Sequence, residues 1–173
     1  MKVFGFAGWS GSGKTTLVEQ VVKVLSARGL AVSLVKHAHH SFDIDHPGKD
    51  SWRHREAGCR EVLISSGRRW SLTHELRGTD EPSLDELLPK LSDCDLVLIE
   101  GFKRAAIPKM EVRRLAVREP MLSPDDAWIV AVATDVPLAT ALPQLDINDP
   151  AAVADFVIAH CFADSLPQLT TSL

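Results

Sequence analysis

The sequence has few of the features that mark secreted or membrane proteins. Its three cysteines, Cys59, Cys94 and Cys161, are far apart and form no C-x-x-C pair, which argues against a zinc knuckle and against a disulfide framework. No stretch approaches the roughly 18 apolar residues that a membrane-spanning helix needs. The start of the chain has neither the long apolar region nor the cleavage site of a signal peptide. We therefore expect a cytoplasmic protein with no membrane contact.

The overall charge gives no sign of a polyanionic partner. With 19 basic and 23 acidic residues the formal net charge is −4, so neither nucleic acid nor an anionic membrane would attract the protein as a whole.

The composition is that of a folded protein, because 45% of the 173 residues are hydrophobic, enough for a packed core. We expect a single domain over residues 1–165 and a frayed tail over residues 166–173.

The most informative segment is residues 8–15, G-W-S-G-S-G-K-T, which match the phosphate-loop pattern G-x-x-x-x-G-K-[ST] in full. An apolar run precedes the loop, and apolar residues at helical spacing follow it, as this motif requires. The backbone N–H groups of such a loop surround an anion, its lysine reaches the β- and γ-phosphates, and its last hydroxyl binds Mg²⁺. The candidate phosphate-binding residues are Gly8, Ser10, Gly11, Ser12, Gly13, Lys14, Thr15 and Thr16.

The rest of the chain alternates strands with helices. Buried parallel strands are expected at residues 31–36, 95–100 and 128–135, with an edge strand at 110–114 and a final helix at 149–162. A β-hairpin at about residues 61–75 interrupts this alternation, and a short helix capped by Asp50 or Ser51 precedes it. The predicted fold class is α/β, a P-loop NTPase-type three-layer sandwich with a mainly parallel sheet and a β-hairpin insertion.

Two acidic residues end predicted strands, where ligands bind in open α/β sheets. Glu100 stands where a P-loop protein places the acid that holds Mg²⁺, so Thr15 and Glu100 are the expected metal ligands. Asp135 could accept two hydrogen bonds from the N1–H and N2–H₂ edge of guanine, which adenine lacks. This favours GTP, although no N-K-x-D sequence is present and Asp135-Val136-Pro137 would also serve as a turn.

Polar residues are concentrated in two further segments. The first allows a metal site, a solvated polar loop, or a loop that senses nucleotide and orients an attacking water through Asp43 and Asp45; it contains His37, His39, His40, Asp43, Asp45 and His46. The second is either a solvated face or an anion-binding or partner surface, because arginine favours phosphate and carboxylate; it contains Arg53, His54, Arg55, Arg60, Arg68 and Arg69.

Together these motifs resemble the molybdopterin-guanine dinucleotide biosynthesis protein B (MobB) family. Besides the phosphate loop, the resemblance rests on K-H-A-H-H at 36–40, P-G-K-D-S at 47–51, E-G-F-K at 100–103 and A-T-D-V-P-L at 133–138. It covers nearly the whole chain. The family often has Asp where this chain has Ala38, which weakens the case for a metal in the loop that contains His37, His39 and His40.

The resemblance implies a GTP-binding adaptor with weak GTPase activity in molybdenum cofactor biosynthesis. Such a protein assists the guanylyltransferase MobA, which attaches GMP to molybdopterin, and it forms a homodimer through its hairpins; molybdopterin or a molybdoenzyme apoprotein is a further expected partner. By position, Gly11 to Thr16 would hold the phosphates, Thr15 and Glu100 the Mg²⁺, and Asp135 the guanine. Asp43, Asp45 and Lys49 would form the nucleotide-responsive loop. Gly101 and Lys103 are further candidates for the GTP site; judged from the residues alone, Lys103 and Arg104 could reach a bound phosphate or simply face water.

Two other functions share the phosphate loop. A small-molecule kinase would need an arginine-bearing lid and an acceptor pocket, and neither pattern is evident. A purely structural dimer would keep a nucleotide only for stability. The motifs contain no evident arginine finger or water-positioning glutamine, so slow intrinsic hydrolysis is expected.

Overall fold

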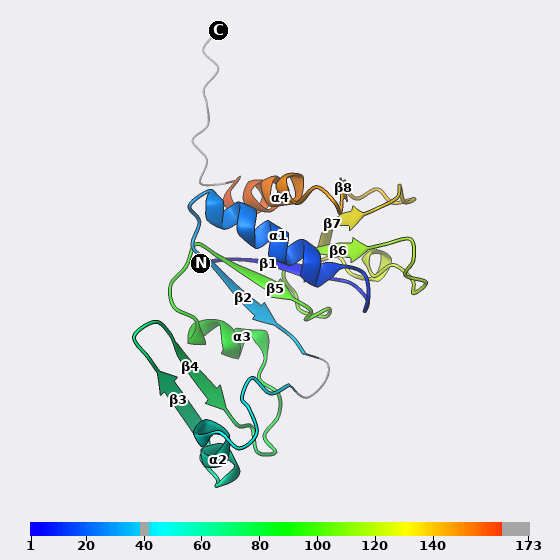
Figure 1. Ribbon diagram of the computed structural model, residues 1–173. Helices are drawn as coiled ribbons and strands as arrows, with labels where there is room; N and C mark the ends of the chain where they lie inside the picture. The colour runs from blue at the N-terminus through cyan, green and yellow to red at the C-terminus, as the bar shows by residue number, and fades with distance from the viewer. Residues whose placement is uncertain (39–41, 164–173) are drawn as a thin grey trace. The chain divides into compact units, whose positions relative to one another are not determined.

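The computed structural model describes residues 1–38 and 42–163, and the chain divides into two compact units (Figure 1). The predictions for His39, His40 and the tail lie outside the described residues. The first unit contains β1 (Lys2–Ala7), α1 (Lys14–Ala27), β2 (Val32–Lys36), β5 (Leu96–Glu100), β6 (Lys109–Arg113), η2 (Ser123–Asp125), β7 (Ile129–Thr134), β8 (Gln144–Asp146) and α4 (Pro150–Phe162). The second contains α2 (Asp50–Glu56), β3 (Glu61–Ser65), β4 (Trp70–His74), α3 (Leu84–Leu87) and η1 (Leu88–Lys90).

The first unit is built on a six-stranded sheet with the order β2-β5-β1-β6-β7-β8. All neighbouring strands in this sheet run parallel. Phe6 of β1 and Lys36 of β2 both pair with Glu100 of β5. Three strands therefore end side by side, and the residues that follow them in sequence meet at the same edge.

Helices α1 and α4 lie together against the sheet (Figure 1). The apolar residues of α1 recur at three- and four-residue spacing, so they form one stripe that the sheet buries. A fully buried Val, Leu or Phe side chain contributes about 1.5–3 kcal/mol relative to exposure. The core formed by these helices and β1 includes Phe4, Phe6, Leu17, Val18, Val21, Leu25, Val153, Ala154 and Val157.

The strand predicted at residues 110–114 is present as β6, but its predicted place at an edge of the sheet is wrong. Strand β6 lies between β1 and β7. Its charged residues Lys109 and Glu111 are each only 1% exposed. The Lys109 ammonium pairs with Asp126 at 2.8 Å, and the Glu111 carboxylate accepts hydrogen bonds from the backbone N–H groups of Leu122 and Ser123. Segments outside the strand thus supply an ion pair to Lys109 and hydrogen bonds to Glu111, which lets an interior strand carry both groups.

In the second unit the predicted hairpin is confirmed, with β3 antiparallel to β4. The predicted helix cap is not found: α2 begins at Asp50, and the Ser51 hydroxyl donates a hydrogen bond to Asp45 at 2.7 Å. Helix α3 begins with a capping box between Ser83 and Glu86 and then tightens into the 3-10 turn η1, which contains Pro89. Proline cannot donate the next helical hydrogen bond, which fits the early end of α3.

The parallel sheet, its helices and the hairpin confirm the predicted α/β class and P-loop NTPase-type fold. Strand β8 was not anticipated, because only three residues form it. Over the described ranges, no helix combines the length and apolarity required to cross a bilayer.

Candidate functional site

The phosphate loop connects β1 to α1. Its first glycine allows the loop to pass close to β6: a Cβ on Gly8 would lie 2.4 Å from the Val112 carbonyl oxygen, and its φ of +150° is one that other residues rarely adopt. The Lys14 ammonium reaches back across the loop and donates to the Trp9 carbonyl at 2.7 Å. The loop is thus a closed turn of backbone with a lysine across it, the arrangement that its sequence predicts.

Three lysines act on one another around this loop. Burial lowers the pKa of Lys14, and Lys103 and Lys36 lower it further, while Glu100 raises it. The Lys103 ammonium lies 4.0 Å from the centre of the Trp9 ring, a cation–π contact. Mutual repulsion of these cations would be relieved by a bound anion, so the electrostatics favour a polyphosphate at the loop.

Thr15, Lys36 and Glu100 meet beside the loop. The Thr15 hydroxyl donates to Oε1 of Glu100 at 2.5 Å, and the Lys36 ammonium lies 3.2 Å from the same oxygen and 3.3 Å from Oγ1 of Thr15. Glu100 is buried, with 7% of its side chain exposed. The two predicted metal ligands are therefore together.

This group fits Mg²⁺ in its chemistry. A hydroxyl and a carboxylate are hard oxygen donors of the kind that Mg²⁺ takes, with water and phosphate oxygens as its remaining ligands. A positive charge, the Lys36 ammonium, already lies within 3.3 Å of both oxygens. The position therefore attracts cations.

The E-G-F-K turn follows Glu100 directly. Gly101 has φ +93°, and a Cβ there would lie 2.9 Å from Cβ of His37. Phe102 has φ +44°, which is uncommon for a residue other than glycine, and its ring centre lies 4.9 Å from that of His37. Close packing of the turn against the end of β2 fixes where Lys103 leaves the backbone and reaches Trp9.

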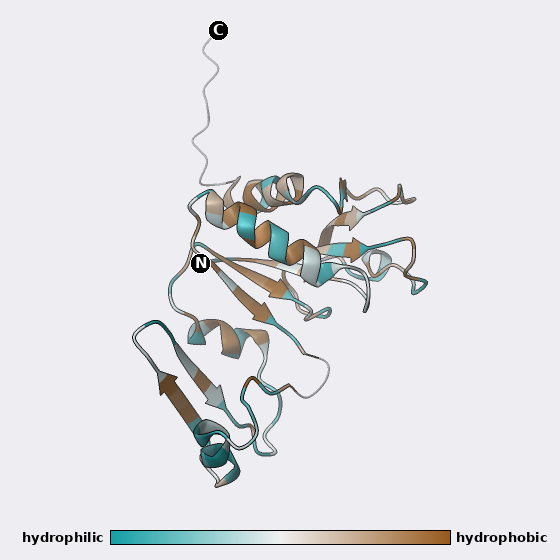
Figure 2. Ribbon diagram, viewed as in Figure 1, coloured by the Kyte–Doolittle hydropathy of each residue, from teal (hydrophilic) through white to brown (hydrophobic). Residues whose placement is uncertain are grey.

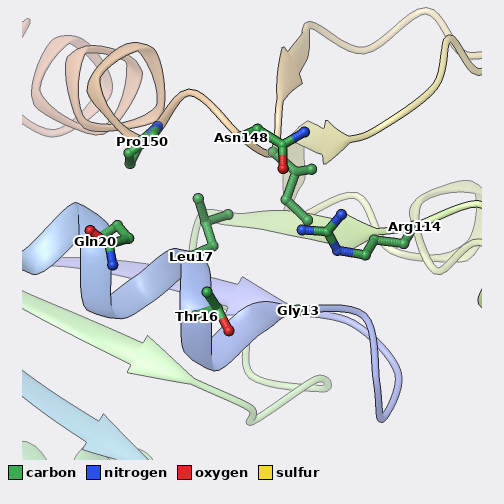
Figure 3. A pocket seen from close by; sticks show the side chains of 8 residues that line it. Gly13, Thr16, Leu17, Gln20, Arg114, Asn148 and Pro150 are labelled. Carbon is green, nitrogen blue, oxygen red and sulfur yellow. The ribbon is translucent and has the colours of Figure 1, made fainter.

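A cavity of about 320 Å³ opens beside the start of α1 (Figure 3). Figure 3 shows Arg114 reaching from the end of β6 toward Gly13, with Asn148 across the cavity from α1. The lining residues are Gly13, Thr16, Leu17, Gln20, Arg114, Ile147, Asn148 and Pro150.

Asp135, the predicted guanine ligand, is not among these lining residues. Its Oδ1 accepts a hydrogen bond from the Leu115 backbone N–H at 2.8 Å, and its Oδ2 lies 3.6 Å from Nη1 of Arg114. Both carboxylate oxygens thus already have donors or a cation nearby.

Asp43 and Asp45 belong to the second unit, where they surround Arg55. The Arg55 side chain is 10% exposed and also pairs with Glu75 at 2.6 Å. Hydrogen bonding by Arg55 lowers the pKa of Asp43, and hydrogen bonding by Ser51 is the largest cause that lowers the pKa of Asp45. These two carboxylates anchor a loop to α2.

The remaining predicted residues of the second unit are less informative. Lys49 is exposed at the position before α2. In the predicted basic cluster, Arg55 is buried, whereas Arg53, His54, Arg60, Arg68 and Arg69 are exposed. Across the ranges 1–38 and 42–163, no cluster of His, Cys, Asp or Glu side chains is suited to a metal ion.

Sequence reasoning did not anticipate Lys36 and Arg114 as site residues. The signal for Lys36 was its place at the end of a predicted strand, because β2 and β5 pair in register and so bring it to Glu100. Arg114 directly follows β6 in the same way, but the assignment of that strand to the sheet edge concealed it.

The comparisons with known proteins agree with this geometry. The family model described as "Molybdopterin guanine dinucleotide synthesis protein B", MobB, matches residues 3–135. The chain belongs to the MobB family. It is 42% identical over 159 residues to the molybdopterin-guanine dinucleotide biosynthesis adapter protein of Escherichia coli K12, covering 90% of this chain and 91% of that protein. It is also 42% identical to the adapter protein of that name from Haemophilus influenzae, over 90% of this chain and 86% of the relative.

Solved MobB structures have the same fold. The crystal structure of Bacillus subtilis MobB superposes with a TM-score of 0.74 at 28% identity, covering 93% of this chain and 98% of that one. A MobB homologue from Bacillus stearothermophilus gives a TM-score of 0.72 at 25% identity, covering 94% and 99%.

Proposed function

We propose that this MobB family member is a GTP-binding adaptor of molybdopterin-guanine dinucleotide biosynthesis, with weak Mg²⁺-dependent GTPase activity. The observation that carries the proposal is the meeting of Lys14, Thr15, Lys36 and Glu100 at the phosphate loop. The role in cofactor biosynthesis is supported by the names of its relatives at 42% identity.

Each residue of the site has a distinct task in this proposal. Lys14 and Lys103 supply positive charge to the β- and γ-phosphates, and the backbone N–H groups of residues 11–16 surround them. Thr15 and Glu100 would hold Mg²⁺, which neutralises charge on the phosphates when bound. Burial of Glu100 strengthens its hold on any cation, because water competes less there.

Slow hydrolysis is expected from the state of the acidic residues. Asp43 and Asp45 were the candidates to orient the attacking water, but ion pairs with Arg55 already engage both. A carboxylate held by a guanidinium is a weaker base, since its pKa is lowered. The protein would therefore hydrolyse GTP slowly and act mainly as an adaptor rather than as an enzyme.

We also propose that the protein is a homodimer joined by the hairpin. Leu63 pairs directly with Leu72 across β3 and β4, and Trp70 lies on the same face. These side chains are 61%, 47% and 62% exposed respectively, and Figure 2 shows the apolar character of β3. A two-stranded sheet with an exposed apolar face is marginal alone, and both of its outer edges can pair with another strand.

The partner enzyme in this proposal is the guanylyltransferase MobA, with molybdopterin or a molybdoenzyme apoprotein as further partners. We place the protein in the cytoplasm, where its three free cysteines would stay reduced.

Calorimetric titration with non-hydrolysable GTP and ATP analogues, with and without Mg²⁺, tests the nucleotide assignment. Selective binding of the GTP analogue that strengthens with Mg²⁺ is expected. Lys14→Ala should abolish it, whereas Lys23→Ala, which removes a lysine paired with Glu19 on the exposed face of α1, should not. Equal or preferred binding of the ATP analogue would refute the guanine assignment and support a kinase.

The adaptor role is tested with purified MobA. Addition of this protein with GTP should raise the rate at which MobA forms molybdopterin guanine dinucleotide, and the Lys14→Ala variant should not. An equal increase with the variant would show that the nucleotide has only a structural role.

A further inference from the structure

We propose that Arg114 contacts the nucleotide beside the phosphate loop, and that Asp135 acts on the nucleotide through Arg114 rather than by binding the base. The inference rests on the proposed function, because it assigns two residues within the same nucleotide site. Arg114 is then a binding residue and Asp135 a positioning residue.

The direction of the bound nucleotide follows from two neighbouring threonines. Consecutive residues of a helix point about 100° apart, so Thr15 and Thr16 serve different sides of α1. Thr15 faces Glu100 and Lys36, the side of the metal and of the β- and γ-phosphates. Thr16 lines the cavity with Gln20. The cavity therefore lies on the side that receives the α-phosphate and the nucleoside.

The Arg114 guanidinium lies over the last glycine of the phosphate loop. A Cβ on Gly13 would be 3.0 Å from Nε of Arg114 and 3.7 Å from Nη2, and Figure 3 shows the side chain directed toward this point. Gly13 is also the N-cap of α1, where helix N–H groups lack partners and favour an anion. A guanidinium and a helix start at the same place form a site for a phosphate.

The Arg114 guanidinium has N–H groups that could donate hydrogen bonds to such a phosphate. Within the part of the chain that the structure describes, its carboxylate partner is Asp135, and the 3.6 Å between Nη1 and Oδ2 exceeds a hydrogen bond. A phosphate oxygen could take N–H groups of Arg114 without breaking a hydrogen bond to Asp135.

Asp135 is placed to orient this arginine. It accepts from the Leu115 backbone N–H with Oδ1 and faces the Arg114 side chain with Oδ2. One carboxylate thus holds the backbone after Arg114 and attracts its guanidinium. Asp135 does not line the cavity, whereas Gln20 and Asn148 do, and their carboxamides could hydrogen-bond to a purine edge.

Calorimetric titration of GTP and GDP into the full-length protein tests the inference. Arg114→Ala should weaken the binding of both nucleotides about 10- to 100-fold, the range expected for the loss of a hydrogen bond between charged groups. Arg114→Lys should recover part of this loss, because lysine restores the positive charge but not the paired N–H donors of a guanidinium. Arg118→Ala, which removes an exposed arginine four residues away, is the control and should bind normally.

The role of Asp135 is separated by a double-mutant cycle. Asp135→Asn should weaken GTP and GDP, keep the preference for GTP over ATP, and add no further loss when Arg114 is already alanine. Loss of that preference in Asp135→Asn would show that Asp135 reads guanine and would overturn the inference. If Arg114→Ala binds nucleotide with wild-type affinity, the inference about Arg114 is wrong but the proposed function stands. If the wild-type protein does not bind GTP, both are wrong.

Discussion

At the scale of single residues, Lys36 adds a positive charge beside the two oxygens that are expected to bind Mg²⁺. We predict that Lys36→Met weakens GTP binding about fivefold to tenfold and GDP binding less. The Lys36 ammonium lies on the side of the γ-phosphate, and the side chain is half exposed. Titration calorimetry with both nucleotides measures the difference. Lys23→Met is the matched control, and an equal loss for GTP and GDP would contradict the placement of this charge.

The ion cluster around Arg55 predicts a pH dependence of stability. The folded protein lowers the pKa values of Asp43 and Asp45, so the unfolded chain takes up protons first as the pH falls. The contribution of these two carboxylates to the free energy of unfolding is therefore fully present above about pH 5, and it is lost progressively as the pH falls through about 4, the ordinary pKa of Asp, and below. The urea midpoint followed by circular dichroism should fall with pH in this range. The midpoint should fall less steeply with pH for Asp43→Asn than for the wild type. Asp80→Asn, which changes an exposed carboxylate in the same unit, is the control and should behave like the wild type. If the midpoint falls equally steeply in all three proteins, the cluster is not responsible for the pH dependence.

At the scale of elements, the hairpin has more apolar surface than a two-stranded sheet can bury by itself. We predict that Leu63→Lys abolishes the proposed dimer and leaves a monomer, since the leucine is 61% exposed and a charge there could not be buried in an interface without a partner. Sedimentation equilibrium gives the mass. Asp80→Lys, which adds a cation elsewhere in the unit, should remain dimeric; a dimeric Leu63→Lys protein would move the interface to another surface.

Strand β6 carries charged residues in the interior of the sheet. Its sequence, K-M-E-V-R, has the alternation of a half-exposed strand, yet Lys109 and Glu111 are buried. Periodicity indicates which residues share a face, but it does not indicate whether other segments will supply ion pairs and hydrogen bonds to the polar face. The partners, Asp126 and the backbone of Leu122 and Ser123, lie 11 to 17 residues later in the chain.

At the scale of the whole molecule, nucleotide binding should raise thermal stability by mass action. At a GTP concentration about 100 times the Kd, the stabilisation is about 2.7 kcal/mol, which corresponds to about 5–10 °C for a chain of this size. Differential scanning calorimetry with Mg²⁺ should show this shift in the wild-type protein. The same shift in Lys14→Ala would mean that the ligand acts away from the phosphate loop.

Local sequence was sufficient for the phosphate loop, for α1 and for the hairpin. Glycines at fixed spacing, a helical stripe of valines and leucines, and two alternating runs around a short turn each specify structure through nearby residues alone. Thr15 and Glu100 could also be paired from the sequence, because both were expected at the carboxyl edge of one parallel sheet.

The strand order and the charged groups around the site could not be predicted, because they depend on which segments become neighbours in the folded chain. The order of the sheet placed β6 in its interior and brought Arg114 to Gly13. The register of β2 with β5 brought Lys36 to Glu100. Packing of the loop on α2 set Asp43 and Asp45 against Arg55. Local backbone preferences are enough to specify the conformation of the phosphate loop. The charges that surround that loop depend on contacts between residues far apart in the chain.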